Sequence, residues 1–319
     1  MIAQGALVEE FEYSVGSYLR LGFGVATSSG TAALVLALQI LGIGRGAEVI
    51  LPTYVCRSVL EAVMTVGATP KICDVGHNWV MTSDEVERFV SDRTAAIIAV
   101  HIFGIPVDVE SLKDFEVPVI EDACQALGMK VNGVPAGGLG DLGILSFHAT
   151  KCLTTAEGGM VVSNNNQLIA DARRRRDGTN GIAERTPTPL SDLQAALGLS
   201  QLSRYDQFLE RRRKLRSLYT QAFQSSDVVE LLDSDTDFLF RFPLRVKTPF
   251  KVLQAKMRER NVAIRQGVDQ LLHRDMGMAD GSYPNAVKAF EHTASIPFYP
   301  ALCEQECKDV AEALIEVCM

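Results

Sequence analysis

The sequence lacks the cysteine spacing of zinc sites and of disulfide-rich secreted domains. Its seven cysteines are odd in number and scattered, they include no CxxC pair, and only five histidines accompany them. We therefore interpret the cysteines as reduced thiols of a cytoplasmic protein, and we expect no metal site.

Positive charge is also in short supply. Lysine and arginine number 31 against 39 aspartate and glutamate residues, so the net charge is -8 and the sequence pI is near 5.3. An acidic chain is a poor partner for nucleic acid, because phosphate binding needs a basic face. A local basic patch could still bind a small anionic substrate.

Long apolar runs are missing as well. No run reaches the length that spans a membrane, and the N-terminus does not combine a basic segment with an apolar one. The 319 residues are nevertheless 47% hydrophobic, which is enough to bury a large core. We expect a soluble intracellular protein without membrane or nucleic-acid partners.

The N-terminal part alternates short apolar strands with amphipathic helices at βαβ spacing. This order predicts an α/β fold with a mainly parallel sheet flanked by helices, and ligands in such folds gather at the carboxyl ends of the strands. We expect helices at 7–21, 32–38, 58–66, 83–90, 108–115 and 166–176, and strands at 23–27, 48–51, 70–75, 95–100, 117–120, 143–147 and 160–162.

The C-terminal part changes character. A turn-rich stretch at 178–189 precedes one long amphipathic helix, predicted over 191–224, and a smaller α+β domain follows. The predicted domains are therefore a large domain, 1–200, and a bridging helix with a small C-terminal domain, 201–319. In the small domain we expect a strand pair near 238–246, a helix near 250–260, an extended piece at 262–265 and a helix from Gln305.

Lys151 follows a predicted strand at its polar end, and a Glu-Gly-Gly turn comes shortly after it. A lysine kept partly out of water has its ammonium form disfavoured, so its amine can attack a carbonyl as a Schiff-base lysine does. The alternative for any single lysine is a side chain that reaches along the surface into water. Only the other motifs of the chain can distinguish a Schiff-base lysine from a surface lysine here.

Two other strand ends carry polar groups. Ser28 to Thr31 lead from a strand into an apolar helix, and the free amides and hydroxyls there suit either a phosphate or a plain helix cap. Asp122 follows another strand, where a carboxylate needs a cation or a strong donor. A pyridinium N–H would be a suitable partner for this carboxylate.

Three further features have competing interpretations. Tyr54 could present its ring to a flat ligand or lie in the core. His101 is better explained as a hydrogen-bonded structural histidine. The run from Arg173 to Arg176 is better explained as a solvated helix face than as a patch for a substrate phosphate.

Taken in order, these residues resemble the DegT/StrS-type sugar aminotransferases, which are pyridoxal-phosphate (PLP) enzymes with the aspartate aminotransferase fold (fold type I). The similarity covers nearly the whole chain. Its motifs are SGTAAL at 29–34, PTYVC at 52–56, VHIFG at 100–104, EDACQALG at 121–128, SFHATK at 146–151, EGG at 157–159, LQAALG at 193–198 and IPFYP at 296–300.

The resemblance implies a role for each candidate residue. Lys151 would hold PLP as a Schiff base and shuttle the proton during amino transfer. Asp122 would pair with the pyridinium nitrogen and keep it protonated. Gln125 would lie near the ring oxygen, Gly30, Thr31 and Ser146 would hold the phosphate, Tyr54 would stack on the ring, and His148 would lie near the substrate.

The resemblance also implies a reaction and an assembly. Family members typically aminate a nucleotide-linked keto sugar in amino sugar biosynthesis, with glutamate or glutamine as donor. They are homodimers with each site at the interface. A related branch dehydrates a sugar carbon and has histidine in place of the lysine, so Lys151 favours transamination.

The chain departs from the family pattern at two places. No further N-terminal segment precedes the first helix, and Pro187-Thr188-Pro189 stands where an Asn-x-Arg motif usually reaches the partner's cofactor phosphate. Asn180, in the same loop, could replace that asparagine. Two alternatives stay open: a catalytically weak relative that binds PLP or a sugar nucleotide in a regulatory or assembly role, and a PLP-dependent sugar dehydratase.

Overall fold

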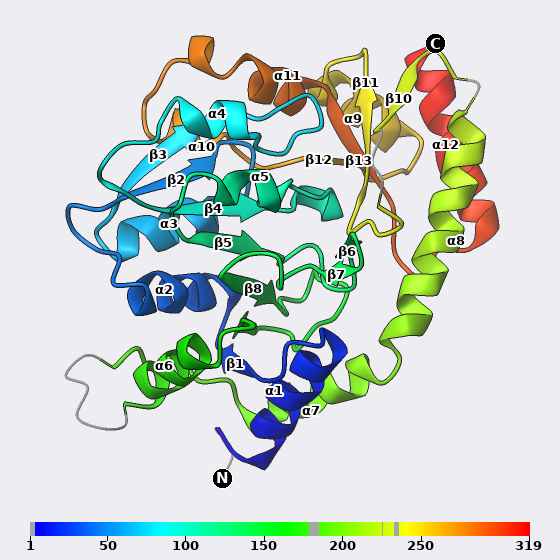
Figure 1. The fold of residues 1–319 in the computed structure, drawn as a ribbon. Coiled ribbons are helices and arrows are strands. Elements are labelled where there is room, and N and C mark those ends of the chain that lie inside the picture. The colour runs from blue at the N-terminus through cyan, green and yellow to red at the C-terminus, as the bar shows by residue number, and fades with distance from the viewer. Residues whose placement is uncertain (1–3, 179–184, 225, 233–235) are drawn as a thin grey trace.

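A seven-stranded sheet forms the centre of the molecule, and the computed structural model describes residues 4–178, 185–224, 226–232 and 236–319 (Figure 1). The strand order is β1-β9-β8-β5-β4-β2-β3, with β8 to β3 parallel and β9 antiparallel to both of its neighbours. This confirms the predicted α/β fold. The strands are β1 (Gly24–Thr27), β2 (Glu48–Pro52), β3 (Thr69–Cys73), β4 (Thr94–Val100), β5 (Val119–Asp122), β8 (Leu142–Ser146) and β9 (Gly159–Val162).

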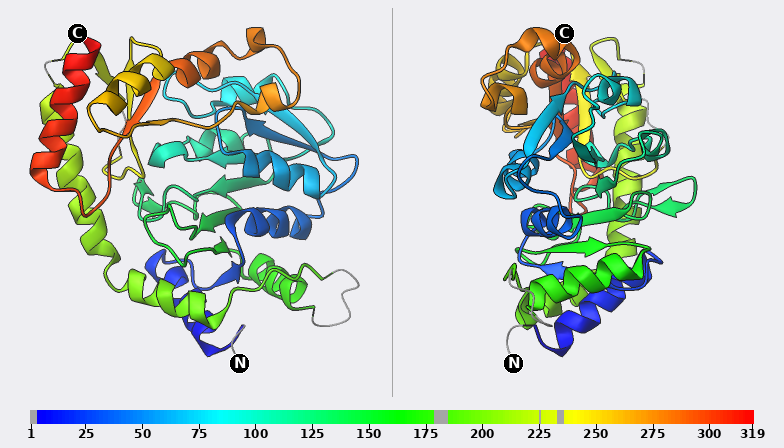
Figure 2. Two further views of the ribbon diagram at one scale, coloured as in Figure 1. Left: turned by 180° about the vertical axis from the view of Figure 1, so that it is seen from behind. Right: turned by 60° about the vertical axis from the view of Figure 1, so that its left-hand side comes forward.

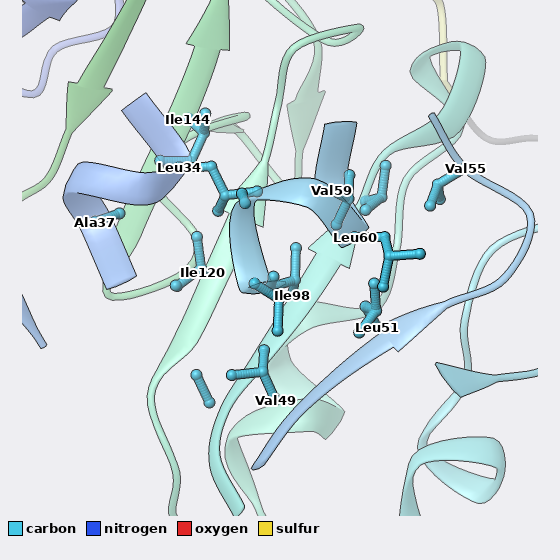
Figure 3. Close-up of a cluster of buried hydrophobic side chains, with 14 of the residues drawn as sticks. Leu34, Ala37, Val49, Leu51, Val55, Val59, Leu60, Ile98, Ile120 and Ile144 are labelled. Carbon is cyan, nitrogen blue, oxygen red and sulfur yellow. The ribbon is translucent and has the colours of Figure 1, made fainter. Parts of the chain in front are cut away.

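Helices cover both faces of this sheet, because successive residues of a strand point to opposite sides. In β2, Val49 and Leu51 pack in the cluster that contains α2 and α3, whereas Ile50 packs in the cluster that contains α4 and α5. Figure 3 shows the first cluster, with Leu34 of α2 near the side chains of the middle strands. The helices are α2 (Gly30–Ile40), α3 (Arg57–Thr65), α4 (Ser83–Glu87) and α5 (Val109–Lys113).

The arginine run ends helix α6 (Asn166–Asp177), and the predicted solvated face is wrong for Arg176. Arg176 is buried, and its guanidinium lies 2.5 Å from Glu12 Oε1 and 2.7 Å from Asp177 Oδ1. Arg173 reaches the other oxygen of Glu12 at 2.7 Å. Both arginines therefore tie α6 to helix α1 (Ala6–Tyr18), which leaves neither of them for a substrate phosphate.

The single helix predicted over 191–224 is wrong, because the structure has two helices there, α7 (Asp192–Leu202) and α8 (Tyr205–Phe223). Arg204 between them has φ -118° and ψ 6°, outside the helical region. The fully buried Tyr205 donates from its hydroxyl to the Leu127 carbonyl oxygen at 2.7 Å, which fixes the start of α8. The apolar period continues through both helices, so spacing alone does not reveal the break. Figures 1 and 2 show α8 leading away from α7 along one side of the molecule.

A second sheet lies beside α8, with strand order β10-β11-β13-β12 and antiparallel pairing throughout. The strand pair predicted near 238–246 is wrong: that stretch supplies only β11, whose partners come from distant parts of the chain. Helices α8, α9 and α12 complete the apolar cluster of this sheet. The elements are β10 (Val229–Leu231), β11 (Phe242–Val246), α9 (Phe250–Glu259), β12 (Arg265–Gln266), β13 (Thr293–Ile296) and α12 (Glu304–Cys318).

Between β12 and β13 the chain returns to the large sheet, an excursion that the sequence did not suggest. Leu272 donates its backbone N–H to the Thr53 carbonyl oxygen at 3.1 Å. Asp74 accepts the backbone N–H groups of Asn285 and Ala286 at 3.0 and 2.9 Å. The returning segment contains α10 (Leu272–Asp275), the short helix η2 (Asp280–Ser282) and α11 (Pro284–His292).

The remaining regular elements are short. They are η1 (Ile102–Gly104) and the hairpin of β6 (Lys130–Val131) with β7 (Val134–Pro135). Among the helices of the described residues, none is both long and apolar enough to cross a membrane.

Candidate active site

Asp122 and Ser146 end two neighbouring parallel strands, so both lie at the edge of the large sheet that the carboxyl ends of its strands form. In the register of β5 with β8, Asp122 is paired with Ile144, two residues before Ser146. Asp122 is buried, and its Oδ1 accepts the backbone N–H of Cys124 at 3.0 Å. The strand ends thus bring a buried carboxylate and a hydroxyl to the same place.

The start of α2 meets this edge. Ser29 Oγ accepts the Ala32 N–H at 3.1 Å, which confirms that Ser29 caps the helix. A Cβ at Gly30 would lie 3.0 Å from Ser146 Cβ and 3.2 Å from Cys124 Sγ, so only glycine fits without a shift. The first amides of a helix have no intrahelical acceptor, so the corner formed by α2 and Ser146 has the chemistry of an anion site.

Lys151 lies in the loop after β8 and is partly buried. Its backbone N–H donates to the His148 carbonyl oxygen at 2.9 Å, and its Nζ lies 5.0 Å from the centroid of the Phe240 ring. Burial and the Asp122 carboxylate raise the pKa of the Cys124 thiol, while the Lys151 ammonium acts in the opposite direction. Lys151 thus lies in the loop after β8, and β8 is the neighbour of the strand that ends at Asp122.

Tyr54 is fully buried, and its ring makes edge or tilted contacts with Trp79 and Phe103 at centroid distances of 6.2 and 6.3 Å. Its hydroxyl has no hydrogen-bond partner within the described residues. A Cβ at Gly267 would come within 1.8 Å of that oxygen, so the phenol points to the small domain. These contacts are those of a core tyrosine; stacking on a ligand stays a prediction. Burial raises the pKa of the Tyr54 phenol.

Gln125 follows Cys124 at the same strand end. Its Oε1 accepts the backbone N–H of Phe103 at 2.8 Å, and Phe103 has a φ of 58°. The glutamine side chain therefore holds the η1 turn, which carries the aromatic neighbour of Tyr54. Its predicted place near a cofactor ring oxygen stays a prediction.

His101 is a structural histidine, as the sequence predicted. The Val107 N–H donates to His101 Nδ1 at 3.0 Å, so the ring proton is on Nε2, which donates to Glu121 Oε1 at 2.8 Å. Glu121 also accepts the backbone N–H groups of Gly137, Leu139 and Gly140 at 2.6, 2.8 and 3.1 Å. Burial raises the pKa of Glu121, but the hydrogen bonds from His101 and the amides outweigh burial and lower it.

His148 lies in the lysine loop with an exposed side chain. Its Nδ1 accepts the Thr150 N–H at 3.2 Å, and its Nε2 lies 3.4 Å from Glu157 Oε1. The structure thus places His148 near Lys151 in the chain without directing it to Asp122 or Ser146. Its predicted place near the substrate stays a prediction.

The site also contains residues that the sequence reasoning missed. Phe240 contacts Lys151, and the Arg241 guanidinium carbon lies 5.5 Å from the same ring centroid. Both come from the stretch before β11, where alternating apolar residues indicated only a strand.

The loop that departs from the family pattern is described only in part. Asn180, the candidate replacement for the missing asparagine, lies outside the described residues. The Thr188 carbonyl oxygen accepts the Ser28 N–H at 2.9 Å. The Pro-Thr-Pro run therefore lies against the start of α2, beside the anion corner.

Comparison with known proteins agrees with this geometry. The model of the DegT/DnrJ/EryC1/StrS aminotransferase family matches residues 1–315. The chain belongs to this family. It is 32% identical to a GDP-perosamine synthase of Vibrio cholerae over 68% of its own length and 62% of the relative's. It is 29% identical to the spore coat polysaccharide biosynthesis protein SpsC of Bacillus subtilis over 99% of its own length and 90% of the relative's.

Solved structures of sugar aminotransferases have the same fold. The PLP form of the putative sugar aminotransferase Spr1654 from Streptococcus pneumoniae superposes with a TM-score of 0.91, 26% identity, and coverage of 99% of this chain and 92% of that one. DesI in the presence of its TDP-sugar product has a TM-score of 0.92, 26% identity, and coverage of 99% and 86%. The family, the enzyme class of PLP-dependent aminotransferase and the cofactor predicted from the motifs are confirmed.

The residues at the strand ends fit pyridoxal phosphate. Gly30 at the start of α2 leaves space that a side chain would fill, and the backbone amides of the helix start suit a phosphate. A buried carboxylate and an amine without a carboxylate partner among the described residues stand beside it. The three groups match an anionic phosphate, a protonated ring nitrogen and an aldehyde, respectively.

Proposed function

We propose that this family member transfers an amino group from glutamate or glutamine to a keto sugar linked to a nucleotide. One observation carries the proposal: Asp122 ends β5, Ser146 ends the neighbouring β8 against Gly30, and Lys151 lies in the loop that follows β8. The relatives named for perosamine synthesis and for a TDP-sugar product support a sugar as acceptor. The reaction supplies amino sugars in the cytoplasm, which suits the free cysteines.

Bound pyridoxal phosphate supplies an aldehyde for the amino group and a ring that accepts an electron pair. Lys151 anchors the cofactor and then moves the proton at the donor's α-carbon, since its amine is the basic group of this edge. The buried Asp122 carboxylate holds a positive charge at the ring nitrogen, where water is excluded. In this proposal Gly30, Thr31 and Ser146 would bind the phosphate, Gln125 would lie near the ring oxygen, Tyr54 would stack on the ring, and His148 would lie near the substrate.

The working unit in this proposal is a homodimer with sites at the interface. Helix α7 supports it, because Leu193 and Leu197 lie one turn apart and are 77% and 41% exposed. Light scattering of wild type and of Leu193→Glu would test it. We expect a dimer for wild type and a monomer for the variant; a monomeric wild type would contradict the assembly.

The test of the reaction is a half-reaction followed by absorption. Purified protein loaded with PLP should lose the visible band of bound cofactor when L-glutamate is added, while the band of pyridoxamine phosphate rises. Addition of a nucleotide-linked keto sugar should then restore the first band and yield an amino sugar. If PLP binds but no amino donor changes the spectrum, the catalytically weak relative is the better account; deoxy sugar formed without a donor would indicate a dehydratase.

A further inference from the structure

A cavity of about 750 Å³ lies next to the lysine loop, on the side of the small domain. Thr150, the residue before Lys151, lines it together with Phe240, whose ring contacts the Lys151 ammonium. Arg241, Arg265 and Ser295 line it from the small domain. The cavity therefore reaches from the lysine loop into the small domain, where part of the motif at 296–300 also lines it.

Arginines dominate the charge of this cavity. Four of them line it, and within the described parts of the chain only Arg260 has an ion pair, 3.3 Å from Glu316. Arg212, Arg241 and Arg265 have no carboxylate at ion-pair distance among those residues. The two acidic lining residues make hydrogen bonds at the start of α12 instead of pairing with these arginines. Glu306 accepts the Cys303 N–H at 2.7 Å, and Asp309 accepts from the Gln305 side chain at 2.8 Å.

Arg212 is a buried side chain with an unsatisfied donor. It is 8% exposed, and its Nη1 donates to the Phe240 carbonyl oxygen at 3.0 Å. Its Nε is buried and has no hydrogen-bond partner within the described residues. A buried guanidinium with a free donor is costly, because desolvation is not repaid by a counter-charge or a hydrogen bond.

Arg241 likewise has no ion pair among the described residues. Its one hydrogen bond in the described structure is a long contact, 3.4 Å, to the Gly267 carbonyl oxygen. Burial, and next the charge of Arg265, lower the pKa of Arg241 although the Asp269 carboxylate acts to raise it, so its surroundings disfavour the cation. Guanidinium groups bind carboxylate and phosphate through paired N–H donors, and such a ligand would supply the missing compensation.

We propose that this arginine-lined cavity binds an oxyanion of a substrate whose reacting carbon lies at Lys151, with Arg241 as its main ligand and Arg212 and Arg265 beside it. The inference rests on the proposed function, because it assigns this anion to one of the two substrates. The oxyanion is either a carboxylate of the amino donor or a phosphate of the nucleotide-linked sugar. The Phe240 ring contacts both Lys151 and Arg241, and in this proposal the rest of the substrate passes over it.

The experiment titrates two probes into PLP-loaded protein by calorimetry: glutarate, a dicarboxylate without an amine, and UDP, a nucleoside diphosphate. The variants are Arg241→Gln, Arg241→Lys and the matched control Arg260→Gln, whose arginine lines the same cavity but is paired with Glu316. Arg212 is not substituted, because its bond to the Phe240 carbonyl oxygen also holds the fold.

We expect Arg241→Gln to weaken one probe at least about tenfold, Arg241→Lys to weaken it less, and Arg260→Gln to leave it within about twofold. A loss for glutarate assigns the anion to the donor, and a loss for UDP assigns it to the sugar nucleotide. The visible band of bound PLP should be unchanged in Arg241→Gln.

Three results would overturn the inference: neither probe binds wild type, both probes bind Arg241→Gln as they bind wild type, or Arg260→Gln weakens them equally. Loss of PLP from Arg241→Gln would assign the arginine to the cofactor instead and would also overturn it. If wild type takes up no PLP, the proposed function fails; the same titration on cofactor-free protein still decides whether the anion site exists.

Discussion

Two buried carboxylates occupy adjacent positions at the end of β5, and they differ in the number of hydrogen bonds that they receive. Glu121 points to one face and receives four hydrogen bonds, from His101 and three backbone amides. Asp122 points to the other face and, within the described residues, receives one hydrogen bond, from the Cys124 N–H. The first is saturated by the protein and serves the fold, whereas the second has capacity left for a ligand.

The arginines repeat this contrast. Arg176 in α6 is buried against Glu12 and Asp177, and it joins two helices. Arg241 beside Lys151 is also partly buried, yet no carboxylate of the described chain pairs with it. In these two comparisons the saturated group belongs to the structural core, and the unsaturated group belongs to the proposed site.

The largest effect should come from the site lysine. Lys151→Ala removes both the anchor of the cofactor and the proton carrier, so we expect the glutamate half-reaction to fall by at least about 10²–10⁴-fold. Stopped-flow absorption with added PLP measures it. The exposed Lys130 provides the control, and Lys130→Ala should react as wild type does. A Lys151→Ala protein with the wild-type rate would contradict the assignment.

The largest effect on stability should come from a saturated cluster. Glu12→Gln removes the charge that pairs with Arg173 and buried Arg176, while Asp177 stays beside Arg176, so we expect the free energy of unfolding to fall by about 3 kcal/mol. Urea denaturation measures it. Glu9→Gln, on the exposed face of the same helix, should change stability by less than about 0.5 kcal/mol. Equal losses in the two variants would show that the pair is not structural.

The different roles of the two adjacent carboxylates can be tested by substituting each one in turn. Glu121→Gln should cost about 1–3 kcal/mol of unfolding free energy, because a side-chain amide cannot accept all four donors, and it should leave PLP binding intact. Asp122→Asn should show the reverse, with near-native stability and a slow half-reaction. Denaturation and stopped-flow absorption of both variants test the pair; one shared phenotype would remove the distinction.

Glu121 also gives stability a pH dependence with a definite sign. Its pKa is lower in the folded protein than in the unfolded chain, so its contribution is present above the unfolded pKa and is lost as the pH falls through the folded one. Wild type should therefore lose stability faster than Glu121→Gln on acidification below the ordinary range of a glutamate. Urea midpoints measured across that range check this; parallel curves would contradict it.

The smallest effects should come from two buried tyrosine hydroxyls. Tyr205→Phe removes a hydroxyl bonded to the Leu127 carbonyl oxygen and should cost about 0.5–1.5 kcal/mol. Tyr54→Phe removes a buried hydroxyl without a partner in the described structure, and its cost should be near zero. Thermal unfolding of the two variants compares them. A larger loss for Tyr54→Phe would mean that its hydroxyl is satisfied.

Much of the large domain could be predicted from the sequence, because its strands are short apolar runs separated by helices of regular period. The break at Arg204 could not, since the apolar period of α7 continues into α8. The partners of β11 come from distant parts of the chain, and pairing over such separations leaves no local pattern.

The candidate site divides in the same way. Lys151, Asp122 and the start of α2 follow strands and belong to recognisable motifs. Arg241 and Phe240 come from a strand-like stretch of the small domain, and only tertiary packing brings them to Lys151. The burial of Arg176 depends on its pairing with Glu12, which lies 164 positions earlier in the chain. A local run of charges cannot reveal such a distant partner.

The most direct test of the central claim is chemical. PLP-loaded protein is reduced with borohydride, digested, and mapped by mass spectrometry for the phosphopyridoxyl group. The account predicts that the group is on the peptide containing Lys151 and disappears in Lys151→Ala. A label on another lysine, or none on protein that visibly binds PLP, would contradict the placement of the cofactor at this edge of the sheet.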